Sequence, residues 1–459
     1  MSDYLFKEFD EVSSKEWKQK IQVDLKGADY NETLIWKNLE GIDVKPFYHQ
    51  DEFKADFKEI PGFPKDWNIA QSIFIDDEKI ANHLIVDAIK RGAEAVVLIA
   101  NNEFNIEQVF NEFSFENTII YFDLKFLSES FISNLKQFFS NKTASVFYNI
   151  DIIGNLAKSG NWYSNLKGDH STLAKIIEQN PQENIVSVDG TLFQNSGATM
   201  VQQLAYCLSQ ANEYLNHFKN TPLSKNNTFS ITFKLSLGSN YFFEIAKIRA
   251  LRKLYALLAN EYSFSTECHI ITFPSNRNKT IYDYNINMLR TTTENMSAII
   301  GGSNTVCNNS YDSIFHKSNE FGERIARNQL LILKQESYFE ASNNPAKGSY
   351  YIETITDQLS EKALTLFKNI EANGGFLSQL KEGTIQRKLK ESAQKEQELF
   401  DSGALELLGT NVHQNPNDKM KDDLELFPFM KKNTRKTLIE PILERRLSEK
   451  NEQERLKTE

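Results

Sequence analysis

The sequence has 459 residues, of which 40% are apolar and 25% are charged, and its formal net charge is -10. An acidic chain repels a phosphate backbone, so we predict no nucleic-acid partner. The longest apolar runs, such as residues 95–100, are far shorter than the ~20 residues of a membrane span. The N-terminus lacks a secretory signal, and Cys207, Cys268 and Cys307 show no C-x-x-C spacing. These features predict a cytoplasmic protein with reduced thiols.

From residue 68 onward, short β-branched or aromatic runs alternate with longer segments of helical period. The runs predict eight strands, the first ending near Ile75 and the others at 93–100, 117–123, 144–151, 184–190, 227–237, 267–274 and 304–310. The segments between them predict eight helices, at about 77–91, 104–113, 127–140, 170–180, 197–219, 240–260, 284–300 and 320–340. Eight strand–helix pairs without a hairpin signal predict an α/β fold, the (β/α)8 TIM barrel. A doubly wound open sheet is the competing interpretation, which the absence of G-x-G-x-x-G after the first strand disfavours.

The segments on either side of the predicted barrel, which spans residues 68–345, have a different character. Residues 1–67 predict one helix at about 13–26 followed by an extended arm. Residues 346–410 predict a helical extension packed on the barrel. Residues 411–459 form a charged C-terminal tail whose last part is either a polar helix or a disordered end.

Three aspartates, Asp123, Asp151 and Asp189, lie at predicted strand ends, where active sites of such barrels are found. They could serve as acid and base in hydrolysis. The favoured interpretation is that they cap the following helices, because no histidine and almost no lysine accompanies them. The seven histidines are scattered without metal-ligand spacing, so we predict no metal site.

Residues 282–306, YDYNINMLRTTTENMSAIIGGSNTV, contain an N-x-x-R-T-T-x-E helix that runs into Gly-Gly and the last strand. This segment resembles the signature of the methylmalonyl-CoA mutase family, and the matching residues are Asn287, Arg290, Thr291, Glu294, Gly301 and Gly302. The helix at 323–337 resembles the family's R-I-A-R-N helix through Arg324, Arg327 and Asn328. Residues 39–52 and 344–364 are similar to the family's N-terminal arm and its loop after that helix. The resemblance implies a (β/α)8 barrel and adenosylcobalamin-dependent isomerisation of methylmalonyl-CoA and succinyl-CoA.

The chain departs from the family pattern where the resemblance implies catalysis. Thr191 and Leu192 stand where the family's acyl-CoA-contacting Tyr and His are expected, and leucine offers no hydrogen bond to a thioester. No histidine has an aspartate two residues before it, so the cobalt-ligating D-x-H-x-x-G motif is absent, and about fifty residues follow the predicted extension. The resemblance therefore implies a non-catalytic small subunit that binds no cofactor and forms a heterodimer with a large catalytic subunit carrying adenosylcobalamin.

Two other functions stay open on the sequence. The chain could be an independent acyl-CoA-binding or hydrolytic barrel that uses Asp123, Asp151 and Asp189. Alternatively, a separate cobalamin-binding protein could complete this barrel, although Leu192 would leave the acyl-CoA site defective.

Overall fold

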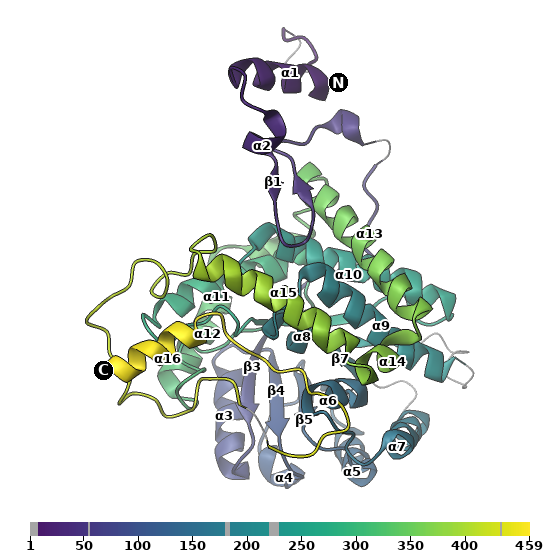
Figure 1. The fold of residues 1–459 in the computed structure, drawn as a ribbon. Helices are drawn as coiled ribbons and strands as arrows, with labels where there is room; N and C mark the ends of the chain where they lie inside the picture. The colour runs from purple at the N-terminus through teal and green to yellow at the C-terminus, as the bar shows by residue number, and fades with distance from the viewer. Residues whose placement is uncertain (1–7, 54–55, 180–183, 220–228, 432–433) are drawn as a thin grey trace.

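The computed structural model describes residues 8–459 except 54–55, 180–183, 220–228 and 432–433. Eight parallel strands form a closed barrel in the order β10-β3-β4-β5-β6-β7-β8-β9 (Figure 1). The predicted (β/α)8 fold is thus confirmed. The strands are β3 (Asn68–Phe74), β4 (Ala95–Ala100), β5 (Ile119–Leu124), β6 (Ser145–Ile150), β7 (Asn184–Asp189), β8 (Thr232–Leu237), β9 (His269–Pro274) and β10 (Thr305–Cys307). Positions 227 and 228 of the sixth predicted strand and position 180 of a predicted helix lie outside the described residues.

The helices around the barrel largely follow the predicted segments. They are α3 (Glu78–Lys90), α4 (Ile106–Val109), α5 (Glu129–Phe139), α7 (Leu166–Gln179), α9 (Met200–Phe218), α10 (Tyr241–Glu261), α11 (Ile286–Gly301) and α12 (Glu320–Leu331). Helix α4 is much shorter than the predicted 104–113, because the backbone turns left-handed at Glu112 (φ 54°). Phe110 and Phe113, beside that turn, pack against each other. Two short helices, α6 (Ile152–Ser159) and α8 (Thr191–Asn195), follow β6 and β7 directly.

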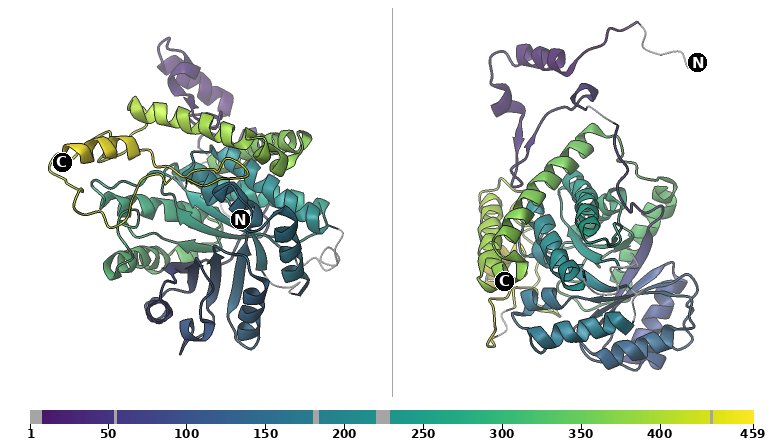
Figure 2. Two further views of the ribbon diagram at one scale, coloured as in Figure 1. Left: turned by 60° about the horizontal axis from the view of Figure 1, so that its bottom comes forward. Right: turned by 90° about the vertical axis from the view of Figure 1, so that its right-hand side faces the viewer.

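The N-terminal arm stands off the barrel (Figure 2, right-hand view). It contains α1 (Ser14–Asp24), α2 (Tyr30–Leu34) and a small hairpin of β1 (Trp36–Lys37) and β2 (Asp43–Val44). Glu40 at the hairpin tip docks the arm, because its carboxylate accepts the backbone N–H groups of Met200 (2.8 Å) and Val201 (2.9 Å) at the start of α9. Burial at this junction raises the pKa of Glu40 to about 7.

The C-terminal part begins with α13 (Tyr350–Ala372), α14 (Gly375–Lys381) and α15 (Thr384–Asp401). Helix α13 packs on α9 and α10. The chain then returns across the barrel and ends in α16 (Glu449–Thr458), drawn in yellow in Figure 1. Of the two sequence alternatives for the end of the chain, the structure has the polar helix. Although the segment is highly charged, Ile439, Ile442 and Leu447 are buried in it.

Within the described part of the chain, no helix combines the length and the apolar character that crossing a membrane requires.

Candidate functional site

The C-terminal strand ends bring the three predicted aspartates to one pocket. Asp123 is the penultimate residue of β5, Asp151 follows β6 and Asp189 ends β7, and all three line a cavity of about 70 Å³. We call this cavity the strand-end pocket; its other lining residues are Leu124, Lys125, Asn149, Gly154, Asn155, Lys158, Tyr163, Ser187, Leu192 and Lys234. The structure thus brings together the three carboxylates that the sequence places at strand ends.

Lys234 of β8 is the central residue of the strand-end pocket, and the sequence analysis missed it. Its Nζ atom lies 2.8 Å from Asp189 and 3.3 Å from Asp123, although the lysine is only 7% exposed. A lysine as the one charged residue in the strand-like run NTFSITFKLSL was a usable signal, because lysines are almost never buried without a partner. Lys125 forms a further ion pair with Asp123 at 2.8 Å.

This ion cluster fixes the protonation of the pocket. Burial disfavours charge on Asp123 and Asp189, but Lys234 outweighs it and holds the pKa of both carboxyls below the usual value. The same two carboxylates overcome the burial of Lys234 and raise its pKa above the usual value. Two ionised carboxylates around a permanently charged ammonium offer neither a general acid nor a nucleophilic amine at neutral pH.

Asp151 has a structural role, as the helix-capping interpretation expected. Its carboxylate caps α6 by accepting the N–H of Gly154 at 2.7 Å, and it also accepts the N–H of Asp189 at 2.8 Å. Gln210 and Tyr214 of α9 donate to the same carboxylate, the tyrosine hydroxyl at 2.7 Å. A carboxylate with this many donors fixes the positions of β6, β7 and α9 relative to one another.

The resemblance implies acyl-CoA contacts at positions 191 and 192, and of these two residues Leu192 lines the strand-end pocket. Leu192 is 3% exposed and lines its wall. Thr191 contacts a lining residue of the pocket, since both its backbone N–H and its hydroxyl donate to Asp189. The wall is therefore apolar where the resemblance implies a hydrogen-bonding histidine.

The interior of the barrel below the strand-end pocket is filled by aromatic side chains. Tyr121 of β5 stacks on Phe147 of β6 at 4.8 Å between ring centroids. The Tyr121 hydroxyl reaches His269 (2.7 Å) and Thr305 (2.6 Å) on strands β9 and β10. Burial lowers the pKa of His269 to about 3, so the imidazole is neutral. These contacts leave the axis packed, and a ligand would have to bind at the strand ends.

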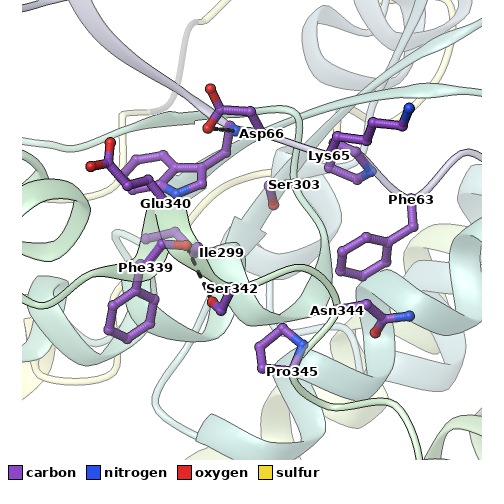
Figure 3. A pocket seen from close by; sticks show the side chains of 12 residues that line it. Phe63, Lys65, Asp66, Ile299, Ser303, Phe339, Glu340, Ser342, Asn344 and Pro345 are labelled. Carbon is purple, nitrogen blue, oxygen red and sulfur yellow. Dashed lines mark hydrogen bonds between the residues drawn. The ribbon is translucent and has the colours of Figure 1, made fainter.

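Two of the other cavities in the described part of the chain lie next to barrel strands. A larger one, of about 560 Å³, lies above the strand ends between Asn276, Asn309 and residues 427–431 and 442–446. We call it the outer cavity, and Lys158 lines both it and the strand-end pocket. The pocket in Figure 3 lies before β3, around Trp67 and Phe339, and is about 20 Å³ in volume. That is room for about one water molecule, so it is too small for a substrate.

Comparison with known proteins decides the family. The family model described as Methylmalonyl-CoA mutase matches residues 110–458, well over half of the chain. This chain belongs to the methylmalonyl-CoA mutase family. A relative from Porphyromonas gingivalis, named Methylmalonyl-CoA mutase small subunit, is 30% identical, with 92% of this chain and 73% of that protein covered. The mutases of Rhizobium meliloti and Homo sapiens are 26% and 28% identical, covering 96% and 87% of this chain and 70% and 60% of their own lengths.

The signature residues of this methylmalonyl-CoA mutase family member stabilise the corner between β9 and α11. Asn287, fully buried, donates to the carbonyls of Thr280 and Tyr311 (both 2.9 Å) and accepts from Arg290 at 2.8 Å. Glu294 forms a buried ion pair with Lys279 at 2.8 Å. The signature that carries the family resemblance thus holds one loop in place.

The remaining signature residues fall into three groups. The hydroxyl of Thr291 accepts from Gln329 and so links α11 to α12, whereas Arg327 of α12 donates to Gln71 of β3 at 2.5 Å and links that helix to the barrel. A side chain at Gly302 would lie 2.5 Å from the Phe63 ring, and one at Gly301 would lie 2.9 Å from Ile248. Arg324 and Asn328 are exposed on α12.

The family resemblance implies a histidine as the cobalt ligand, and the cavities at the strand ends offer none. None of the seven histidines lines the strand-end pocket or the outer cavity. No group of three or more metal-ligating side chains occurs among residues that the structure describes.

Proposed function

We propose that this chain is the non-catalytic small subunit of a heterodimeric, adenosylcobalamin-dependent methylmalonyl-CoA mutase. The large subunit carries the cofactor and isomerises methylmalonyl-CoA to succinyl-CoA, and the present chain stabilises it. The observation that carries the proposal is the ion cluster of Lys234, Asp123 and Asp189, because it fills the place of an acid–base site with fixed charges. The name of the Porphyromonas gingivalis relative supports the same role.

The N-terminal arm supports the partnership. Its apolar side chains are unusually exposed, as with Val12 (54%), Trp17 (50%), Val23 (71%) and Trp36 (49%). Helix α1 contains no buried residue. Large apolar side chains that stay exposed on a projecting segment are typical of a surface that another protein covers. We therefore assign the arm to the heterodimer interface.

A hydrolytic function using Asp123, Asp151 and Asp189 has less support. Hydrolysis by paired carboxylates needs one protonated group, whereas Lys234 keeps Asp123 and Asp189 ionised. Burial raises the pKa of Asp151, but its carboxyl is held as a hydrogen-bond acceptor by donors from α6 and α9. Titration of the isolated chain with acyl-CoA esters in a calorimeter distinguishes the two functions, because saturable micromolar binding would favour the independent barrel.

The decisive experiment is co-expression with a catalytic large subunit from the same genome. We expect a stable 1:1 complex by size-exclusion chromatography with light scattering, and mutase activity that survives D189N in this chain. The matched control is the large subunit alone, which we expect to be less stable to heat. Failure to form the complex, or loss of activity in an intact D189N complex, would refute the proposal.

A further inference from the structure

Residues 434–448 form a strap across the C-terminal end of the barrel, shown in yellow in Figure 1. The strap passes over the segments that follow three strands. In the segment that follows β6, the carbonyl of Gly160 accepts the N–H groups of Leu438 and Ile439 (3.0 and 3.1 Å). The carbonyl of Ala157 accepts the N–H group of Ile442 (2.9 Å). In the segment after β7, the carbonyl of Asn195 accepts the N–H group of Arg445 (3.0 Å). In the segment after β9, the carbonyl of Arg277 accepts the N–H group of Leu447 (2.9 Å). A loop that only crossed the surface would not need a ladder of backbone hydrogen bonds with three separate segments.

Side chains of the strap complete this attachment. Ile439, Ile442 and Leu447 are only 6%, 5% and 4% exposed. Glu444 accepts from Lys158 and Asn195, both at 3.1 Å. Glu444 lines the outer cavity, and its partner Lys158 lines both the outer cavity and the strand-end pocket.

The far end of the strap is held by a buried ion pair. Arg446 is 5% exposed and forms a two-pronged contact with Glu452 of α16, at 3.0 and 2.6 Å. It also donates to the backbone carbonyl of Lys279 at 2.9 Å. At its N-terminal end, the strap packs closely on Gly160. This glycine has a left-handed backbone, and a side chain there would lie 2.7 Å from the carbonyl oxygen of Ile439.

We propose that the strap is an intramolecular plug that closes the C-terminal mouth of the barrel. It takes the place that a ligand or the cofactor-bearing surface of another protein would need in order to reach the strand ends. A separate cofactor protein could then not complete this barrel, and partner chains must dock elsewhere. The inference concerns the isolated chain and does not depend on the small-subunit function.

The test introduces a reporter thiol under the strap. Leu192→Cys lies in the wall of the strand-end pocket, and the three native cysteines are buried. We combine it with I442D, which places a charge at a buried strap position, or with the control L438D, at a position 63% exposed. Maleimide labelling should be slow with the intact strap and unchanged by L438D. We expect I442D to accelerate it by about tenfold or more, because local release exposes buried groups without global unfolding.

Hydrogen exchange provides the folding control. In I442D, the amides of the strap should lose protection while those of β3 to β5 keep theirs. G160A serves as a second releasing variant and should give the same labelling if I442D does not fold. Fast labelling of L192C with an intact strap would overturn the proposal. Unchanged labelling in a folded variant whose strap amides exchange freely would also overturn it.

Discussion

Lys234 lies between two aspartates that would otherwise repel each other at the barrel mouth. Removing one partner of a buried ion pair costs more than the pair itself contributes, because a charge is left without compensation. Without Lys234, the two carboxylates of Asp123 and Asp189 would both lose the positive charge that lies between them. The residue therefore determines the stability of the strand ends as well as their chemistry.

We expect K234M to lower the free energy of unfolding by about 2–4 kcal/mol, less than for a fully buried pair because both aspartates are partly exposed. Urea unfolding followed by circular dichroism measures this loss. The isosteric control K234M/D123N/D189N removes both charges with the cation, and it should recover most of the stability. Equal losses in the single and triple variants would contradict the electrostatic explanation.

The same cluster predicts a pH dependence. Because the pKa values of Asp123 and Asp189 are lowered in the folded state, their contribution is present above the unfolded value of about 4 and is lost as the pH falls below it. In K234M the carboxylates lack the cation, so acidification from pH 7 toward 5 should raise its stability relative to the wild type. Urea midpoints at several pH values test the sign.

Gly302 is a signature residue whose role is steric. Its backbone is left-handed (φ 95°), and a side chain would lie 2.5 Å from the Phe63 ring. Gly403 is also left-handed (φ 78°) but faces open space. We expect G302A to cost about 2–4 kcal/mol of unfolding free energy and G403A about 1–2 kcal/mol, the difference being the clash. Similar losses in thermal unfolding would mean that Phe63 moves aside freely.

Among the elements, α16 depends on a contact that lies outside the helix. Arg446 pairs with Glu452 in a buried site, so R446M leaves a buried carboxylate and should destabilise the attachment of α16 by about 3–5 kcal/mol. Hydrogen exchange of residues 449–458 measures the effect. R445M is the matched control, because its side chain is 52% exposed and its nearest carboxylate is 3.7 Å away. A protected α16 in R446M would show that apolar contacts suffice.

The sequence predicts the position of an element well where the periodicity of apolar residues determines it. It predicts poorly the features that depend on contacts with residues distant in the chain. The eight strands follow from β-branched runs, and each has its counterpart in the barrel. The helix after β4 was predicted too long, because its end depends on the local turn at Glu112. Lys234 was missed because its neighbours in the sequence are apolar and its partners are distant. The packing of residues 434–448 was missed because charge dominates their composition, whereas a few apolar side chains decide their position.

On the scale of the whole molecule, α1 lies in a different part of the arm from the contact that attaches the arm to the barrel. Helix α1 contacts the rest of the arm mainly through Trp17 against Phe47 and through Ser14, which donates its N–H to Asp51 at 2.8 Å. The docking contact of the arm, Glu40 on α9, lies beyond it in the sequence. An arm shortened before Tyr30 would thus keep its attachment to the barrel.

We expect deletion of residues 1–28 to leave the unfolding midpoint of the isolated chain nearly unchanged, while weakening the complex with the large subunit by at least about tenfold. Sedimentation at decreasing concentration measures the affinity, and urea unfolding measures the stability. The point variant W17A should also weaken the complex. An unaffected affinity would place the interface elsewhere.

Barrel closure joins residues that are far apart in the chain: the side chain of Asn68 at β3 donates to the carbonyl of Asn304, 236 positions later. A ribosome takes roughly 10–50 s to add that many residues. During this interval β3 has an unpaired edge that is able to pair with other chains. Production of this protein in a cell therefore depends on translation speed and chaperone supply, in addition to the stability of the finished barrel.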